Sequence, residues 1–152
     1  MDKNPKFIDA TTYKKIYSLV PISCADILVT YKNNFLLGKR VQQPCRGKWC
    51  LPGGRIFKNE TLQVAAKRKL REEFGINAKL SDLKFLTTQG TMFNDSALGG
   101  PVHTINTIFQ LQLKSEPKVK LDTRSHSEIK WFSEINKNLH PYIKIVLKQA
   151  GF

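Results

Sequence analysis

Apolar and polar residues follow one another along this chain in two rhythms, one typical of helices and one typical of strands. Between residues 9 and 20 the apolar side chains have the i, i+3, i+4, i+7 spacing of a helix, and Pro21 ends this segment. Thr61 can cap a second helix that runs to Phe74 and ends at Gly75. Pro141 is well placed to begin a third helix over residues 141–149. The apolar face of the second helix is expected to carry Leu62, Ala66, Leu70 and Phe74.

Strand patterns separate these helices. Residues 22–31 and 35–40 predict two strands around a turn at 32–34, and further strands are expected at 83–93, 102–113 and 129–132. Prolines and glycines interrupt residues 41–55 and 94–101, so these segments are predicted to be loops. Helices at intervals around a mixed set of strands indicate an α/β (α+β) sandwich.

Length and composition narrow the class of protein. A chain of 152 residues predicts one domain, spanning 1–152, with a core of its own. No apolar run approaches the ~20 residues of a membrane-spanning helix, and the first residues lack the apolar stretch of a secretory signal. Cys24, Cys45 and Cys50 have no zinc-like spacing, so we expect reduced thiols and a cytoplasmic location.

The chain is strongly basic, with 25 Lys and Arg against 12 Asp and Glu and a formal net charge of +13. Such a field attracts polyanions, which include nucleotides and nucleic acids. The lysines are scattered rather than gathered in a block interleaved with aromatic residues, as a nucleic-acid groove would require. A solvated lysine surface is therefore favoured over a nucleic-acid site.

The strongest chemical signal lies between the Pro-Gly-Gly turn and the second helix. Gly54 closes the turn, and the helix carries two adjacent carboxylates, Glu72 and Glu73. Positions 69, 72 and 73 share one helix face, because residues three and four apart are neighbours. Paired carboxylates are a hard-oxygen site suited to Mg²⁺ or Mn²⁺. The alternative is a surface helix with Glu–Lys and Glu–Arg ion pairs and no metal.

This segment resembles the box that defines the Nudix hydrolase family. The resemblance implies a Nudix-type α/β/α sandwich with a mixed sheet and the box on a strand-loop-helix. It also implies hydrolysis of a nucleoside diphosphate linked to another moiety. Carried over by position, the metal ligands would be the Gly53 carbonyl, Glu73 and, as an auxiliary ligand, Glu72. Arg68 and Glu60 would orient the loop and the helix. The matching residues are Gly54, Glu60, Arg68, Glu72, Glu73, Gly75 and Ile76.

One position departs from the box, because Lys69 stands where the family has its first Glu. This change removes one negative ligand and places a cation beside Glu72 and Glu73. Several closely spaced Mg²⁺ ions would then lack the charge that offsets their mutual repulsion. We therefore expect one ion, Mg²⁺ with Mn²⁺ as a substitute. The alternative is that Lys69 forms a salt bridge with Glu73 and the metal binds weakly.

A second resemblance, over roughly residues 22–131, is to the GDP-mannose mannosyl hydrolase branch, which also lacks the first Glu. It rests on residues 35–40, Pro44, Gly47, Trp49 and 125–131. That branch displaces GDP from C1 of the sugar, with a histidine as general base and a metal that helps GDP leave. The resemblance also suggests a homodimer.

The residues that match functional positions of that branch are few. His126 matches the general base, and Arg40 and Arg55 match arginines that hold the diphosphate. Asp26 and His103 match positions that contact the substrate. The departures are three: Ser125 replaces a metal-binding Gln, Thr104 replaces a Tyr, and Glu72 is acidic where the branch commonly is not.

Three hypotheses follow from these residues. The first is cleavage of GDP-mannose or a related nucleotide sugar at C1. The second is attack on phosphorus of a nucleoside triphosphate, nucleotide sugar or ADP-ribose-like compound, with Glu128 or a box carboxylate as base. The third is a non-catalytic, basic Nudix module that binds nucleic acid, against which the nearly complete box argues.

Overall fold

The structure is a computed structural model that describes residues 8–152, so the expectation about a secretory signal lies mostly outside it. Three antiparallel pairings and one parallel pairing join a single mixed sheet in the order β3-β2-β1-β6-β5. Two further antiparallel pairings add β4 to β1 and β7 to β2. The helices are α1 (Ala10–Leu19), α2 (Leu62–Phe74) and α3 (Pro141–Gln149), with a short 3₁₀ helix η1 (Leu80–Asp82). The strands are β1 (Ile22–Tyr31), β2 (Asn34–Arg40), β3 (Trp49–Cys50), β4 (Gly53–Arg55), β5 (Lys84–Phe93), β6 (Val102–Leu113) and β7 (His126–Phe132).

The centre of the sheet is the parallel pair β1 and β6, which are far apart in sequence. Their register runs without interruption from Ile22 opposite Thr104 to Tyr31 opposite Leu113. Most of β1 is buried, because both of its faces are covered. This strand therefore holds the residues of the sheet that are furthest from solvent.

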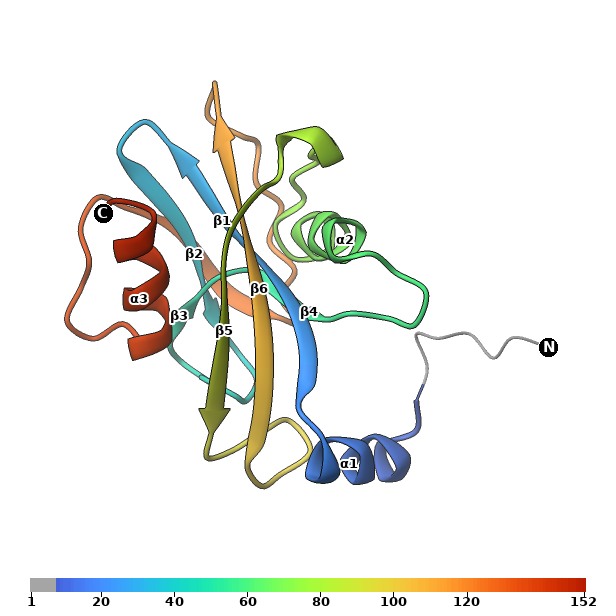
Figure 1. Ribbon diagram of the computed structural model, residues 1–152. Coiled ribbons are helices and arrows are strands. Elements are labelled where there is room, and N and C mark those ends of the chain that lie inside the picture. Colours follow the sequence, from blue (N-terminus) through green and yellow to red (C-terminus); the bar gives the residue numbers. More distant parts are fainter. Residues whose placement is uncertain (1–7) are drawn as a thin grey trace.

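Alternation along the strands divides the core into two layers. Ala25, Ile27 and Val29 point to the side covered by α2, whereas Leu28 points to the side covered by α3. Figure 1 shows these two helices on opposite sides of the sheet. The sandwich predicted from the sequence is therefore confirmed.

The helices end where their sequences predict. The side chain of Thr61 accepts a hydrogen bond from the Val64 N–H at the start of α2, and Gly75 ends the helix with a left-handed φ of 68°. A Cβ at Gly75 would lie 2.6 Å from Cβ of Lys120, so space as well as φ requires glycine there.

Three details differ from the sequence analysis. Residues 41–55 contain the short strands β3 and β4, because their backbone pairs with β2 and β1 despite the prolines and glycines. Strand β7 begins at His126 rather than at 129, since its pairing with β2 extends to Arg40. Leu62 is 41% exposed, and Ala65 takes its place in the buried face of α2.

No helix among residues 8–152 combines the length and the apolar character needed to cross a membrane.

Candidate active site

The loop before α2 is fastened to the helix by one arginine. The guanidinium of Arg68 donates to both carboxylate oxygens of Glu60, at 2.7 and 2.9 Å, and to the backbone carbonyl of Arg55 at 3.0 Å. Glu60 also accepts a hydrogen bond from the backbone N–H of Phe57 at 3.0 Å. A bidentate Arg–carboxylate pair has a fixed geometry, so it sets the angle between loop and helix. These contacts have the orienting effect that the resemblance implies for Arg68 and Glu60.

The two box carboxylates lie at different depths. Glu73 is only 3% exposed, and its Oε2 accepts a hydrogen bond from the Gly53 N–H at 3.2 Å. Glu72 is more open to solvent and forms an ion pair with Arg68 at 3.2 Å. Gly53 therefore approaches Glu73 through its N–H, whereas the resemblance assigns its carbonyl to a metal.

Lys69 lies between the two carboxylates. Its Nζ is 2.6 Å from Oε1 of Glu73 and 3.6 Å from Oε2 of Glu72. The salt bridge named as an alternative in the sequence analysis is thus present. The ammonium also shows that this position accommodates a cation, because it is a positive group held by both box carboxylates.

The carboxylates of Glu72 and Glu73 can bind a hard cation only together with further ligands. Within residues 8–152, no three His, Cys, Asp or Glu side chains are grouped so that they could hold a metal ion. Glu72 and Glu73 supply carboxylate oxygens, and Mg²⁺ ordinarily completes its shell with water and substrate phosphate. The pair therefore fits an ion that is bound partly by the substrate.

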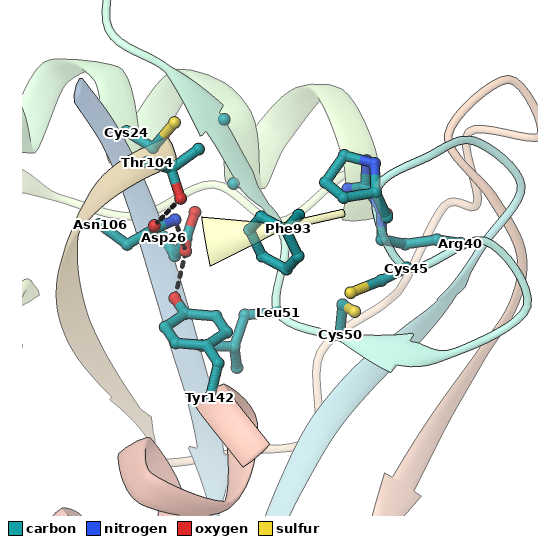
Figure 2. Close-up of a pocket in the computed structure, with 13 residues that line it drawn as sticks. Cys24, Asp26, Arg40, Cys45, Cys50, Leu51, Phe93, Thr104, Asn106 and Tyr142 are labelled. Carbon is teal, nitrogen blue, oxygen red and sulfur yellow. Dashed lines mark hydrogen bonds between the residues drawn. The ribbon is translucent and has the colours of Figure 1, made fainter. Parts of the chain in front are cut away.

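Two hollows lie next to each other near Glu73. One, of about 180 Å³, is lined by Arg40, Gln42, Gly53, Lys69, Glu73 and Ser125. The other, of about 150 Å³, lies between β1, β6, the loop after β2 and the start of α3 (Figure 2). Arg40 and Gly53 line both hollows. The two hollows are therefore neighbouring parts of one candidate site.

Asp26 lies in the wall of the second hollow, in a chain of buried polar groups. Its Oδ2 accepts hydrogen bonds from the Asn106 amide, at 2.7 Å, and from the Tyr142 hydroxyl. The Thr104 hydroxyl donates in turn to the Asn106 oxygen at 2.6 Å (Figure 2). Burial raises the pKa of Asp26 to about 6. Gly53 is required here, because a Cβ would lie 1.9 Å from Asp26 Oδ1.

His126 is buried behind Gly38 and has no exposed surface. Its ring packs edge-on against Phe74, and its Nδ1 is 3.9 Å from Oε2 of Glu73. Within the described chain, neither ring nitrogen has a hydrogen-bond partner. Burial, together with the nearby charges of Arg40 and Lys69, lowers the pKa of His126 to about 4. The imidazole is therefore neutral at neutral pH.

The other predicted residues are distributed unevenly. Arg40 faces both hollows and donates from Nε to the carbonyl of Pro44 at 2.7 Å. The guanidinium of Arg55 lies 4.9 Å from the rings of both Tyr13 and Phe57. His103 lies on β6 opposite Met92. The structure thus brings Asp26, Arg40, Gly53 and Glu73 together, whereas Arg55 and His103 lie outside the residues that line the two hollows.

Several residues that line the second hollow were not predicted from the sequence. Tyr142 and Asn106 complete the contacts of Asp26, and Cys45 and Cys50 line the same hollow. The polar residues Thr104 and Asn106 are two apart in a strand and therefore share one face of the sheet, which was a usable signal. No comparable signal marks Tyr142, which is one aromatic residue on the apolar face of a helix.

Comparison with known proteins agrees with this geometry. The NUDIX domain family model matches residues 21–141. A low-salt glycan biosynthesis protein, Agl8 of Haloferax volcanii, is 32% identical over 145 residues, which cover 94% of this chain and 90% of that protein. An ADP-ribose pyrophosphatase of Methanocaldococcus jannaschii is 35% identical over 65 residues, 43% of this chain and 38% of that protein. The chain belongs to the Nudix hydrolase family.

Solved structures show the same fold at low sequence identity. A MutT Nudix hydrolase from Burkholderia pseudomallei superposes with a TM-score of 0.73 at 24% identity, covering 86% of this chain and 98% of that one. The Nudix domain of Shewanella oneidensis NrtR, solved with ADP ribose, has a TM-score of 0.60 at 21% identity, covering 96% and 82%. These likenesses establish the architecture and leave the substrate to the site itself.

Proposed function

We propose that this Nudix protein is a Mg²⁺-dependent hydrolase of a nucleotide sugar such as GDP-mannose. The observation that carries the proposal is that the two hollows share Arg40 and Gly53, with Glu73 lining one hollow and Asp26 lining the other. A diphosphate suits the first hollow and a polar sugar or base suits the second. The glycan biosynthesis name of the Haloferax relative is consistent with a sugar-bearing substrate.

Each residue has a definite task in this proposal. Arg40 grips phosphate oxygens with its guanidinium, and Gly53 leaves room for the ligand. Asp26, held by Tyr142 and Asn106, accepts a hydrogen bond from the substrate. Glu73 and Glu72 hold the divalent ion, which neutralises the diphosphate and stabilises the leaving group when bound.

Arg55 and His103 remain proposed substrate contacts, at the periphery of the site. Neither lines the two hollows, so each reaches the substrate only at its edge. Arg55 lies between two aromatic rings, a position that fixes its guanidinium without removing its charge.

The first candidate for the chemistry is attack of water on C1 of the sugar, with GDP as the leaving group. It follows from the resemblance to the GDP-mannose mannosyl hydrolase branch and makes His126 the general base. The lowered pKa keeps His126 unprotonated at neutral pH, which is the state that a base requires. Its Nδ1 lies 3.9 Å from Glu73, so it adjoins the box.

The second candidate is attack on phosphorus, which releases GMP. The complete burial of His126 favours it, because a base must reach the water that it activates. The presence of both Glu72 and Glu73 also favours it. A box carboxylate, or Glu128 on β7, is then the base in place of His126.

We also propose that residues 1–152 form one Nudix domain. The resemblance leads us to propose in addition that the protein is a homodimer, and we propose a cytoplasmic location. Nucleic-acid binding by the basic surface is the competing class of function. A steep fall of RNA affinity with salt, together with no turnover of any nucleoside diphosphate derivative, would favour that class.

The test is turnover of GDP-mannose with Mg²⁺, followed by chromatography of the nucleotide products. We expect GDP to accumulate, and we expect Glu73→Gln to reduce the rate at least about a hundredfold, since the amide cannot replace the charged ligand. Glu116→Gln, in the segment after β6, is the matched control and should retain the wild-type rate. A Glu73→Gln protein with nearly normal turnover would remove the box from the mechanism.

A further inference from the structure

Lys69 is held in place more firmly than a surface lysine. Only 19% of its side chain is exposed, and its ammonium is 2.6 Å from the nearly buried carboxylate of Glu73. Its stem crosses the Gly53–Gly54 turn, since a Cβ built on Gly54 would lie 3.1 Å from Cε of Lys69. The side chain therefore occupies a defined path from α2 across β4.

The position of the ammonium is the position that a divalent ion needs. Nζ lies between Oε1 of Glu73 and Oε2 of Glu72, at 2.6 and 3.6 Å. A metal ion bound by these oxygens would face a positive charge at close range, and at short distances this repulsion is large. Metal and ammonium therefore compete for the same carboxylates.

A second position is available to the ammonium group of Lys69. It lines the hollow of about 180 Å³ together with Arg40 and Ser125, and that hollow is the proposed position of the diphosphate. A phosphate group there offers new acceptors to a long, flexible ammonium side chain. Moving from Glu73 to phosphate would exchange one ion pair for another and free the carboxylate.

We propose that Lys69 is an exchangeable counter-ion: it occupies the carboxylate pair in the free protein and moves to the diphosphate when a nucleotide binds. The inference rests on the proposed function, because it assumes that a nucleoside diphosphate enters this hollow. Its consequence is positive coupling, in which nucleotide and metal each strengthen the binding of the other. The protein alone then holds its metal weakly.

The experiment measures Mn²⁺ binding by electron paramagnetic resonance, with and without GDP, in wild type and in Lys69→Met. Methionine keeps an unbranched stem but has neither the charge nor an oxygen ligand. Without GDP, Lys69→Met should bind Mn²⁺ about tenfold more tightly than wild type, within the usual range of coupling between sites. With GDP, the two proteins should differ by much less.

Two control variants distinguish the loss of the Lys69 charge from a general effect on folding or on net charge. Lys67→Met removes the same charge from the same helix, and Lys67 takes part in none of the ion pairs recorded for residues 8–152. It should behave as wild type. Lys69→Gln serves as a second variant should Lys69→Met unfold, with melting curves recorded for both.

Equal Mn²⁺ affinities of wild type and both Lys69 variants, or an equal effect of GDP on all of them, would overturn the inference. Absence of any Mn²⁺ binding to wild type with GDP would overturn it as well. The proposed function fails on a different result, namely no hydrolysis of GDP-mannose or related compounds. The two failures are therefore distinguishable, since binding is read without turnover.

Discussion

At the scale of single residues, the site is defined by charges that are buried or held close together. Asp26 and Glu73 are both nearly inaccessible carboxylates, yet their partners differ. Hydroxyl and amide groups hold Asp26, whereas an ammonium and a backbone N–H hold Glu73. Burial destabilises an ionised carboxylate, and the neutral partners of Asp26 offset this effect less than the ammonium beside Glu73 does.

This cost predicts a pH dependence of stability. Because the pKa of Asp26 is raised from 3.8 to about 6, the native protein keeps a proton that the unfolded chain releases. The stability from this proton is complete below about pH 4 and is lost as pH rises through about 6. Asp26→Asn should therefore be more stable than wild type well above pH 6, by about 3 kcal/mol, and the difference should vanish near pH 4.

Urea unfolding of both proteins at pH 4, 5, 6 and 8 measures this difference. His126, whose pKa is lowered, contributes the opposite trend, a loss of stability as pH falls below its unfolded value. That trend is common to both proteins and cancels in the comparison. A difference that does not change with pH would contradict the assignment.

The cysteines provide a second prediction. The Cys50 thiol donates a hydrogen bond to the sulfur of Cys45 and lowers the pKa of Cys45, while burial raises the pKa of Cys24 to about 12. A thiolate reacts with alkylating agents and a thiol does not. Iodoacetamide at pH 7.5 should therefore label Cys45 first, about tenfold faster than the others.

Peptide mass spectrometry over time identifies the labelled cysteine. Cys45→Ser should abolish the fast phase, and Cys24→Ser should leave it unchanged. Fast labelling of Cys24 would contradict the burial of its thiol next to β6.

At the scale of elements, the packing of β7 on β2 depends on a missing side chain. A Cβ at Gly38 would lie 2.4 Å from Cδ2 of His126. Gly38→Ala should therefore lower the free energy of unfolding by about 2 kcal/mol, as overpacking does. The effect should be smaller in a His126→Ala background, because the clashing ring is absent.

A double-mutant cycle by urea denaturation measures this coupling. Additive effects of Gly38→Ala and His126→Ala would show that the two residues do not contact each other.

Element positions were the most predictable part of the structure. Strand β6 and helix α3 begin and end where the sequence predicts, because long alternation and a helix-initial proline are strong local signals. β3 and β4 were missed, since strands of two and three residues have no pattern and exist only through pairing. His126 was placed before its strand because its pairing with Arg40 follows a register shift that no local pattern marks.

At the scale of the whole molecule, the sequence predicted the box and its carboxylates but not the space around them. The hollow at Asp26 is formed by β1, β6, the loop after β2 and the start of α3, so no local segment of sequence describes it. The contact between Tyr142 and Asp26 joins residues 116 positions apart. Long-range packing of this kind follows from the fold and becomes visible only with it.

In the proposed function, the two hollows together bind a nucleotide sugar that is cleaved at C1. The most direct test is hydrolysis of GDP-mannose with Mg²⁺ in ¹⁸O-water, with mass spectrometry of both products. We expect GDP and mannose that carries the ¹⁸O label, which requires attack on carbon. GMP with mannose 1-phosphate, and label on a phosphate, would contradict attack on carbon and move the role of base from His126 to a carboxylate.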